Sequence, residues 1–151
     1  MTVRRHVTAG PRRPTRGHRV LPHPADVGLA FWAPTRAAAF EEAAQGLLAL
    51  LGVQPTSRPA IVPDQCWRVT GADDVERLFK LLAQLVWAAD TPVGVPAAVR
   101  VREGAGGAVE VEATGRGARG PEGYDVKAVT YHEMAFGPVE GGWAGQAYFD
   151  I

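Results

Sequence analysis

Hydrophobic positions in the first half of the chain change from a continuous run to a helical spacing. Residues 27–32 (VGLAFW) form a short apolar run, which predicts a buried strand. From Thr35 onward, apolar residues recur every three or four positions. This spacing predicts a helix with Thr35 as its N-cap, Gly52 as its end, and Glu41 and Glu42 on its solvent side.

A second helical pattern has clearer boundaries. Asp73 is a suitable N-cap, and Glu76 three residues later completes a pair that resembles a capping box. Apolar residues then repeat at helical spacing as far as Asp90, and Pro92 cannot continue a helix. Because each of the two helices has only one apolar stripe, both are expected to pack on a sheet.

The strands of this sheet are predicted by alternation in the last third of the chain and by a short stretch at 66–70. Glycine-rich turns separate the alternating segments, which predicts two hairpins, 97–103 with 108–114 and 124–136 with 143–151. The fold class that follows is α+β. We expect a two-layer sandwich in which a mostly antiparallel sheet has two helices packed on one face.

Charge divides the chain into a basic start and an acidic remainder. Residues 1–20 contain six arginines and no acidic residue, whereas the rest contains 10 basic and 16 acidic residues. Glycine and proline interrupt the basic segment, so we expect a disordered leader over 1–17 and one folded domain over 18–151. The acidic charge of this domain argues against a main role in binding the phosphate backbone of nucleic acids.

Several functional classes are excluded by what the sequence lacks. Cys66 is the only cysteine, which excludes a zinc site built from several cysteines and fits a reducing, cytoplasmic compartment. No apolar run approaches the roughly 18–20 residues of a membrane helix, so no membrane partner is expected. The P-loop, the dinucleotide-binding glycine pattern, HExxH and GxSxG are also missing, which excludes most familiar enzyme classes.

Two short segments carry reactive side chains at close spacing. His23 and Asp26 flank Pro24 in a turn before a strand, an arrangement usable for metal binding or proton transfer. The alternative is a simple turn in which Asp26 accepts backbone N–H bonds. Lys127 and His132 belong to a predicted strand, where a histidine is more often a hydrogen-bonded core or rim residue than a ligand.

The end of the chain is the third candidate. If the natural chain stops at Ile151, the side chain of Asp150 is followed at once by a terminal α-carboxylate. The strand pattern continues to the last residue, so both carboxylates are expected to be held in the sheet. A hard divalent cation such as Ca²⁺, Mg²⁺ or Mn²⁺ would relieve their repulsion. The alternative is a charged pair that simply faces water.

Three segments together resemble the archease family. The segment HPADVGLAFWAPTRAAAFEEAAQGLLALL is similar to the family's opening turn, strand and helix, and DDVERLFKLLAQLVWAAD is similar to its second helix. The most specific similarity is VKAVTYHEMAFGPVEGGWAGQAYFDI, which resembles the family's C-terminal hairpin with its closing Asp-Ile. The resemblance extends over about residues 18–151.

This resemblance implies a non-enzymatic, metal-binding accessory protein of an RtcB-type RNA ligase. Archeases promote guanylylation and multiple turnover of that ligase in tRNA splicing or RNA repair, and meet RNA only through the ligase. The family's metal site corresponds here to Asp26, Asp150 and the terminal carboxylate of Ile151, with Ca²⁺ as the expected ion. His23, Lys127 and His132 match nearby motif positions, where they support the site or contact the partner.

Two other functions remain open on the residues alone. The first is a free-standing, metal-dependent phosphoesterase acting on RNA or nucleotides, in which Asp26 and Asp150 bind the metal and His23 or His132 acts as acid or base. The second is a structural adaptor whose carboxylates bind nothing. Turnover of RNA by the protein alone, or a lack of divalent binding, would distinguish them.

Overall fold

The computed structural model describes residues 15–22, 26–54, 65–92 and 94–151. Within these residues the chain forms seven strands, two α-helices and one short 3-10 helix. In chain order they are β1 (Gly17–Pro22), β2 (Asp26–Ala33), α2 (Arg36–Leu50), β3 (Gln65–Val69), α3 (Asp74–Ala89), β4 (Ala98–Glu103), η1 (Ala105–Gly107), β5 (Val109–Thr114), β6 (Ala128–Val139) and β7 (Gly142–Asp150).

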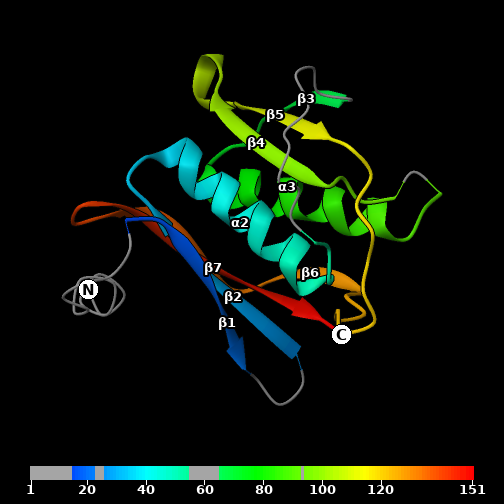
Figure 1. The fold of residues 1–151 in the computed structure, drawn as a ribbon. Coiled ribbons are helices and arrows are strands. Elements are labelled where there is room, and N and C mark those ends of the chain that lie inside the picture. The colour runs from blue at the N-terminus through cyan, green and yellow to red at the C-terminus, as the bar shows by residue number, and fades with distance from the viewer. Residues whose placement is uncertain (1–14, 23–25, 55–64, 93) are drawn as a thin grey trace.

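The α+β class is confirmed, but the strands form two antiparallel sheets where one was expected (Figure 1). The larger sheet has the order β1-β2-β7-β6, and the smaller has the order β3-β5-β4. The two predicted hairpins are the pairs β4–β5 and β6–β7. The sequence did not indicate that β3 and the first hairpin separate from the rest.

Both helices begin where their caps predict. The side chain of Thr35 accepts a hydrogen bond from the backbone N–H of Ala38, and Asp73 accepts one from Glu76 at 2.8 Å. The Glu76 carboxylate in turn accepts from the N–H of Ala72, which closes the capping pair. The bonds to Ala38 and Glu76 satisfy backbone donors that the first turn of a helix leaves unpaired.

Helix α2 lies between the two sheets, which explains why they are separate (Figure 1). The Glu41 carboxylate accepts the N–H of Val101 at 2.9 Å, and the Gln45 amide donates to the carbonyl of Val99 at 2.8 Å. Side chains on the polar side of α2 therefore form hydrogen bonds with backbone groups of the edge strand β4. The expectation that Glu41 and Glu42 face solvent is wrong, because Glu42 is only 9% exposed.

Strand β1 anchors to α2 through the buried Glu42. The Glu42 carboxylate accepts a hydrogen bond from Nε of Arg16 at 2.6 Å and lies 3.0 Å from Nδ1 of His18. The structured part of the chain thus includes Arg16 and Gly17, which the sequence had assigned to the leader. Residues 1–14 of that leader lie outside the described residues.

The hydrophobic core fills the space between α2, α3 and the inner faces of both sheets. Its largest fully buried side chains are Phe31, Phe40, Phe149, Leu29, Leu47, Leu51, Leu78, Leu81, Leu82, Leu85, Val99 and Val109. Close approach of α2 to β2 requires a glycine at position 46, where a Cβ atom would lie 2.7 Å from Leu29 Cδ1. Neither described helix is long and apolar enough to cross a membrane.

Candidate metal centre

Asp26 and Asp150 lie directly opposite each other on neighbouring strands. Asp26 begins β2, Asp150 ends β7, and the two are Cα partners in the antiparallel ladder. Residues paired in this way point their side chains to the same face of a sheet, with Cβ atoms about 4.5–5.5 Å apart. The sheet therefore brings together the two side-chain carboxylates that the sequence analysis selected.

The backbone at the end of β7 is held from both sides. Ala128 of β6 is the second Cα partner of Asp150, and the N–H of Lys127 donates to the carbonyl of Asp150 at 2.8 Å. Figure 1 shows β7 running between β2 and β6 to the C-terminus. Ile151 follows directly after this paired residue, and it is 43% exposed. Ile151 is thus attached to a strand whose last residue is fixed in the sheet.

The two aspartates differ in their exposure to solvent. Asp26 is half-buried, and its Oδ1 atom is shielded from water, whereas Asp150 is exposed. Two like charges directly opposite each other in a ladder destabilise the pair. A cation shared by the two carboxylates reverses that effect, since it is attracted by both.

Tyr148 is a neighbour of this pair that the sequence analysis did not select. It lies two residues before Asp150 on the same face of β7, opposite Gly28 of β2. Burial raises the pKa of the Tyr148 phenol, and the negative charges of Glu133 and Asp26 raise it further. The phenol therefore keeps its proton at neutral pH, beside two carboxylates. Alternation in β7 was the available signal, because it puts Tyr148 and Asp150 on one face.

His132 is displaced from the regular strand by a bulge. The β6–β7 register shifts between Thr130 and Ala135, and Glu133 has a positive φ of 55°. His132 is exposed, and its Nε2 lies 2.9 Å from a carboxylate oxygen of Glu133. Its backbone N–H donates to the Thr130 hydroxyl. The histidine is thus bound to its own bulge, and no described contact joins it to Asp26 or Asp150.

The other expected neighbours contribute less to the described site. The Lys127 side chain is exposed and pairs with Asp125 at 3.8 Å, so only its backbone contacts Asp150. His23 lies outside the described residues. The described structure therefore brings Asp26 and Asp150 together and places Tyr148 beside them.

The donor set suits a hard divalent cation, provided that the chain terminus takes part. Within the described ranges, no three His, Cys, Asp or Glu side chains come close enough together to hold a metal ion. Asp26 and Asp150 are two carboxylates on neighbouring strands, and the third group expected from the resemblance is the α-carboxylate of Ile151. Oxygen ligands of this kind fit Ca²⁺, Mg²⁺ or Mn²⁺ better than zinc or copper.

The fold and site define a class of small α+β proteins with two sheets around a central helix and a carboxylate pair where the C-terminal strand ends. The chain belongs to the archease family, because the model of the Archease protein family (MTH1598/TM1083) matches residues 18–151. The family expected from the sequence is thereby confirmed. Membership supports an accessory role of the archease kind.

Known relatives agree with this assignment. A probable protein archease of Mycobacterium tuberculosis (strain H37Rv) is 29% identical over 149 residues, which cover 97% of this chain and 82% of that protein. The crystal structure of a Thermotoga maritima archease, described as a possible chaperone, matches with a TM-score of 0.61 and 18% identity. The match covers 93% of this chain and 97% of the Thermotoga maritima chain.

A second solved structure supports the same fold. The solution structure of Methanobacterium thermoautotrophicum protein 1598 matches with a TM-score of 0.58 and 21% identity. The match covers 89% of this chain and 99% of that one.

Proposed function

We propose that this protein is a metal-binding accessory factor that activates an RtcB-type RNA ligase. In this function it promotes guanylylation of the ligase and its multiple turnover, in tRNA splicing or RNA repair. Family membership supports the accessory role. The observation on which the proposal mainly depends is the direct pairing of Asp26 with Asp150 beside the C-terminal residue.

Asp26, Asp150 and the terminal carboxylate of Ile151 would hold the cation, most favourably Ca²⁺. A bound divalent cation supplies a positive, Lewis-acidic centre at the surface of the accessory protein. The exposure of Asp150 and Ile151 leaves this end of the sheet accessible to a partner. Tyr148 supports the half-buried side of the site, where its protonated hydroxyl can donate a hydrogen bond to a carboxylate.

The decisive experiment measures transfer of labelled GMP to an RtcB-type ligase from the same organism. Asp26→Asn and Asp150→Asn remove one charge each and keep the side-chain shape, so each should abolish the stimulation. Glu140→Gln, an exposed change in the turn at the far end of the β6–β7 hairpin, is the matched control and should stimulate normally. Full stimulation by both aspartate variants would refute the metal role.

The same assay tests the partner and the alternative enzyme. Wild-type protein that leaves the guanylylation rate unchanged would contradict the ligase proposal. Metal-dependent hydrolysis of RNA or nucleotides by the purified protein, with no ligase present, would instead favour a phosphoesterase. We expect no such hydrolysis, because His132, one of the two histidines offered as acid or base, is bound to Glu133 and Thr130 of its own bulge.

A further inference from the structure

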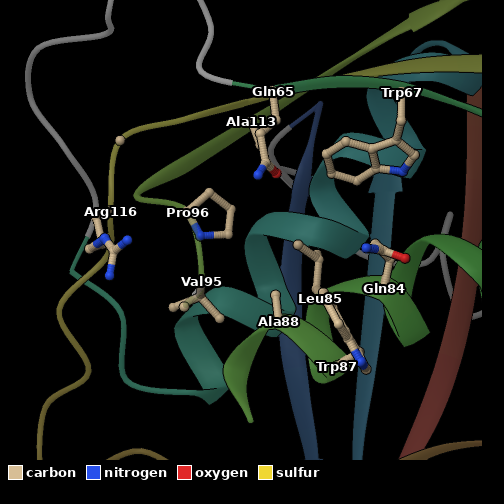
Figure 2. Close-up of a pocket in the computed structure, with 12 residues that line it drawn as sticks. Gln65, Trp67, Gln84, Leu85, Trp87, Ala88, Val95, Pro96, Ala113 and Arg116 are labelled. Carbon is tan, nitrogen blue, oxygen red and sulfur yellow. The ribbon is translucent and has the colours of Figure 1, made fainter. Parts of the chain in front are cut away.

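A cavity of about 390 Å³ lies between α3 and the smaller sheet, separate from the carboxylate pair. Trp67 and Gln65 of β3 line one side, and Gln84 and Trp87 of α3 line the other. The volume falls within the range of about 300–1,000 Å³ that is usual for small-ligand sites. Figure 2 shows the Trp67 ring close to the Gln84 carboxamide, with Leu85 and Ala88 on the helix beneath.

The charge at the cavity is positive and comes from a single side chain among the described lining residues. Arg116 is the one charged side chain among the described residues that line it, in a domain that is acidic outside its basic start. One guanidinium N–H donates to the carbonyl of Pro92 at 3.3 Å, which holds Arg116 beside the loop that follows α3. Because a guanidinium has five N–H donors, this bond leaves donors for an anionic group.

The uncharged lining groups suit a flat heteroaromatic ring. Trp87 is 55% exposed, a large indole surface left in contact with water, and Trp67 is only partly buried. Indole faces stack on nucleobases. The carboxamide of a glutamine presents a donor and an acceptor side by side, which matches the N6 and N7 edge of adenine. Gln65 and Gln84 supply two such groups.

Backbone shape at the cavity rim depends on glycine. Gly94 and Gly115 have positive φ values of 77° and 70°, a conformation that L side chains rarely adopt. An added Cβ at Gly94 would lie 4.0 Å from Nη1 of Arg116. Gly115 directly precedes Arg116 in the chain and Gly94 lies beside its guanidinium, so the two glycines shape the backbone next to the cation.

We propose that this cavity binds a purine nucleoside monophosphate, with the base between the indole and carboxamide groups and the phosphate on Arg116. This site is independent of the metal centre and of the ligase proposal. The combination of two indoles, two carboxamides and a single cation favours a ligand that joins an aromatic base to an anion. A purely apolar ligand would make no use of the two amides and the guanidinium, which are exposed at this cavity.

Titration calorimetry with AMP, adenosine and inorganic phosphate as separate probes tests this proposal. We expect saturable AMP binding, weaker adenosine binding and still weaker phosphate binding. Arg116→Ala should weaken AMP binding about tenfold or more, as for a lost charge-assisted hydrogen bond, and should leave adenosine binding unchanged. Absence of saturable AMP binding at millimolar concentration would overturn the proposal, as would unchanged AMP affinity in Arg116→Ala.

Tryptophan variants test the stacking part of the proposal. Trp87→Ala changes an exposed helix residue and should weaken both AMP and adenosine binding by about fivefold or more. Trp67→Leu should do the same, but its indole also packs against the core, so Trp87→Ala remains the variant that tests stacking if Trp67→Leu fails to fold. Trp32→Phe, on the larger sheet, is the control and should bind normally. Normal adenosine binding by Trp87→Ala would contradict stacking at this site.

Discussion

The Tyr148 ring occupies the space that a side chain at Gly28 would need. A Cβ atom at Gly28 would lie 2.5 Å from Cε1 of the ring, closer than real Cβ contacts allow. The two residues are Cα partners in β2 and β7, two positions along from the Asp26–Asp150 pair. A glycine on one strand thus lets the tyrosine of the other lie over the sheet next to the carboxylates.

Replacing Gly28 should disturb this packing. We expect Gly28→Val to lower the free energy of unfolding by about 1–3 kcal/mol, because the added carbons force the Tyr148 ring to move. Urea denaturation followed by circular dichroism measures this loss. Gly137→Ala is the control, since a Cβ at that glycine of β6 meets nothing within 4 Å. Equal stability of Gly28→Val and wild type would show that the ring moves at no cost.

The buried Glu42 makes stability depend on acidity. Burial alone would raise the pKa of Glu42, but hydrogen bonds from His18 and Arg16 and the charge of Arg16 outweigh it, so the pKa falls below its ordinary 4.5. Stability from this carboxylate is therefore fully present above the unfolded pKa. It is lost as the pH falls through the lower pKa of the folded state.

Glu42→Gln tests this dependence. At neutral pH the variant should be less stable by about 1–3 kcal/mol, because the charge-assisted bond from Nε of Arg16 is weakened and only Glu41 remains as a charged partner of Arg16. The difference from wild type should shrink as the pH falls below 4.5. Unfolding curves at several pH values measure both effects, with exposed Glu140→Gln as control. A difference that stays constant down to pH 2–3, on the order of two units below the ordinary value, would contradict the assignment.

The sequence predicted the local elements better than their assembly. Thr35 and Asp73 identified both helix starts because a cap depends on neighbouring residues only. Small residues obscured the central position of α2, since its alanines and Gly46 bury several faces while its polar side bonds to β4. Hydrophobic spacing reveals which face is apolar, but it does not show that Glu41 accepts a backbone bond from a strand.

The same contrast between local pattern and assembly applies to the candidate site. Asp26 pairs with Asp150, so the two aspartates that the resemblance assigns to one metal site lie on neighbouring strands. The bulge at His132 could not be predicted from a glycine in the sequence, because the residue with the positive φ is Glu133. Tyr148 was missed because a tyrosine in a strand is ordinarily a packing residue, and its neighbours become visible only in the sheet.

Cation binding should be detectable as stabilisation of the folded state. Ligand that binds only the folded protein adds about 2.7 kcal/mol at roughly 100 times its Kd, which raises Tm. We expect Ca²⁺ to raise the Tm of wild type and to leave the Tm of Asp26→Asn and of Asp150→Asn unchanged. In a chelator, each variant should be as stable as wild type or slightly more so, because a like-charge pair is removed. A Tm rise in both variants equal to that of wild type would place the cation elsewhere.

The terminal carboxylate can be tested by extending the chain. A short Gly-Ser extension after Ile151 converts its α-carboxylate into a peptide group and moves the terminal negative charge to the end of the extension, away from Asp26 and Asp150. It leaves the ladder up to Asp150 intact, so the fold and Tm without metal should not change. Calorimetric Ca²⁺ affinity should fall, because the site then has only the carboxylates of Asp26 and Asp150. The same extension placed in the Glu140–Gly141 turn is the control, since that turn lies at the opposite end of the hairpin. Unchanged Ca²⁺ affinity in the C-terminally extended protein would remove Ile151 from the ligand set.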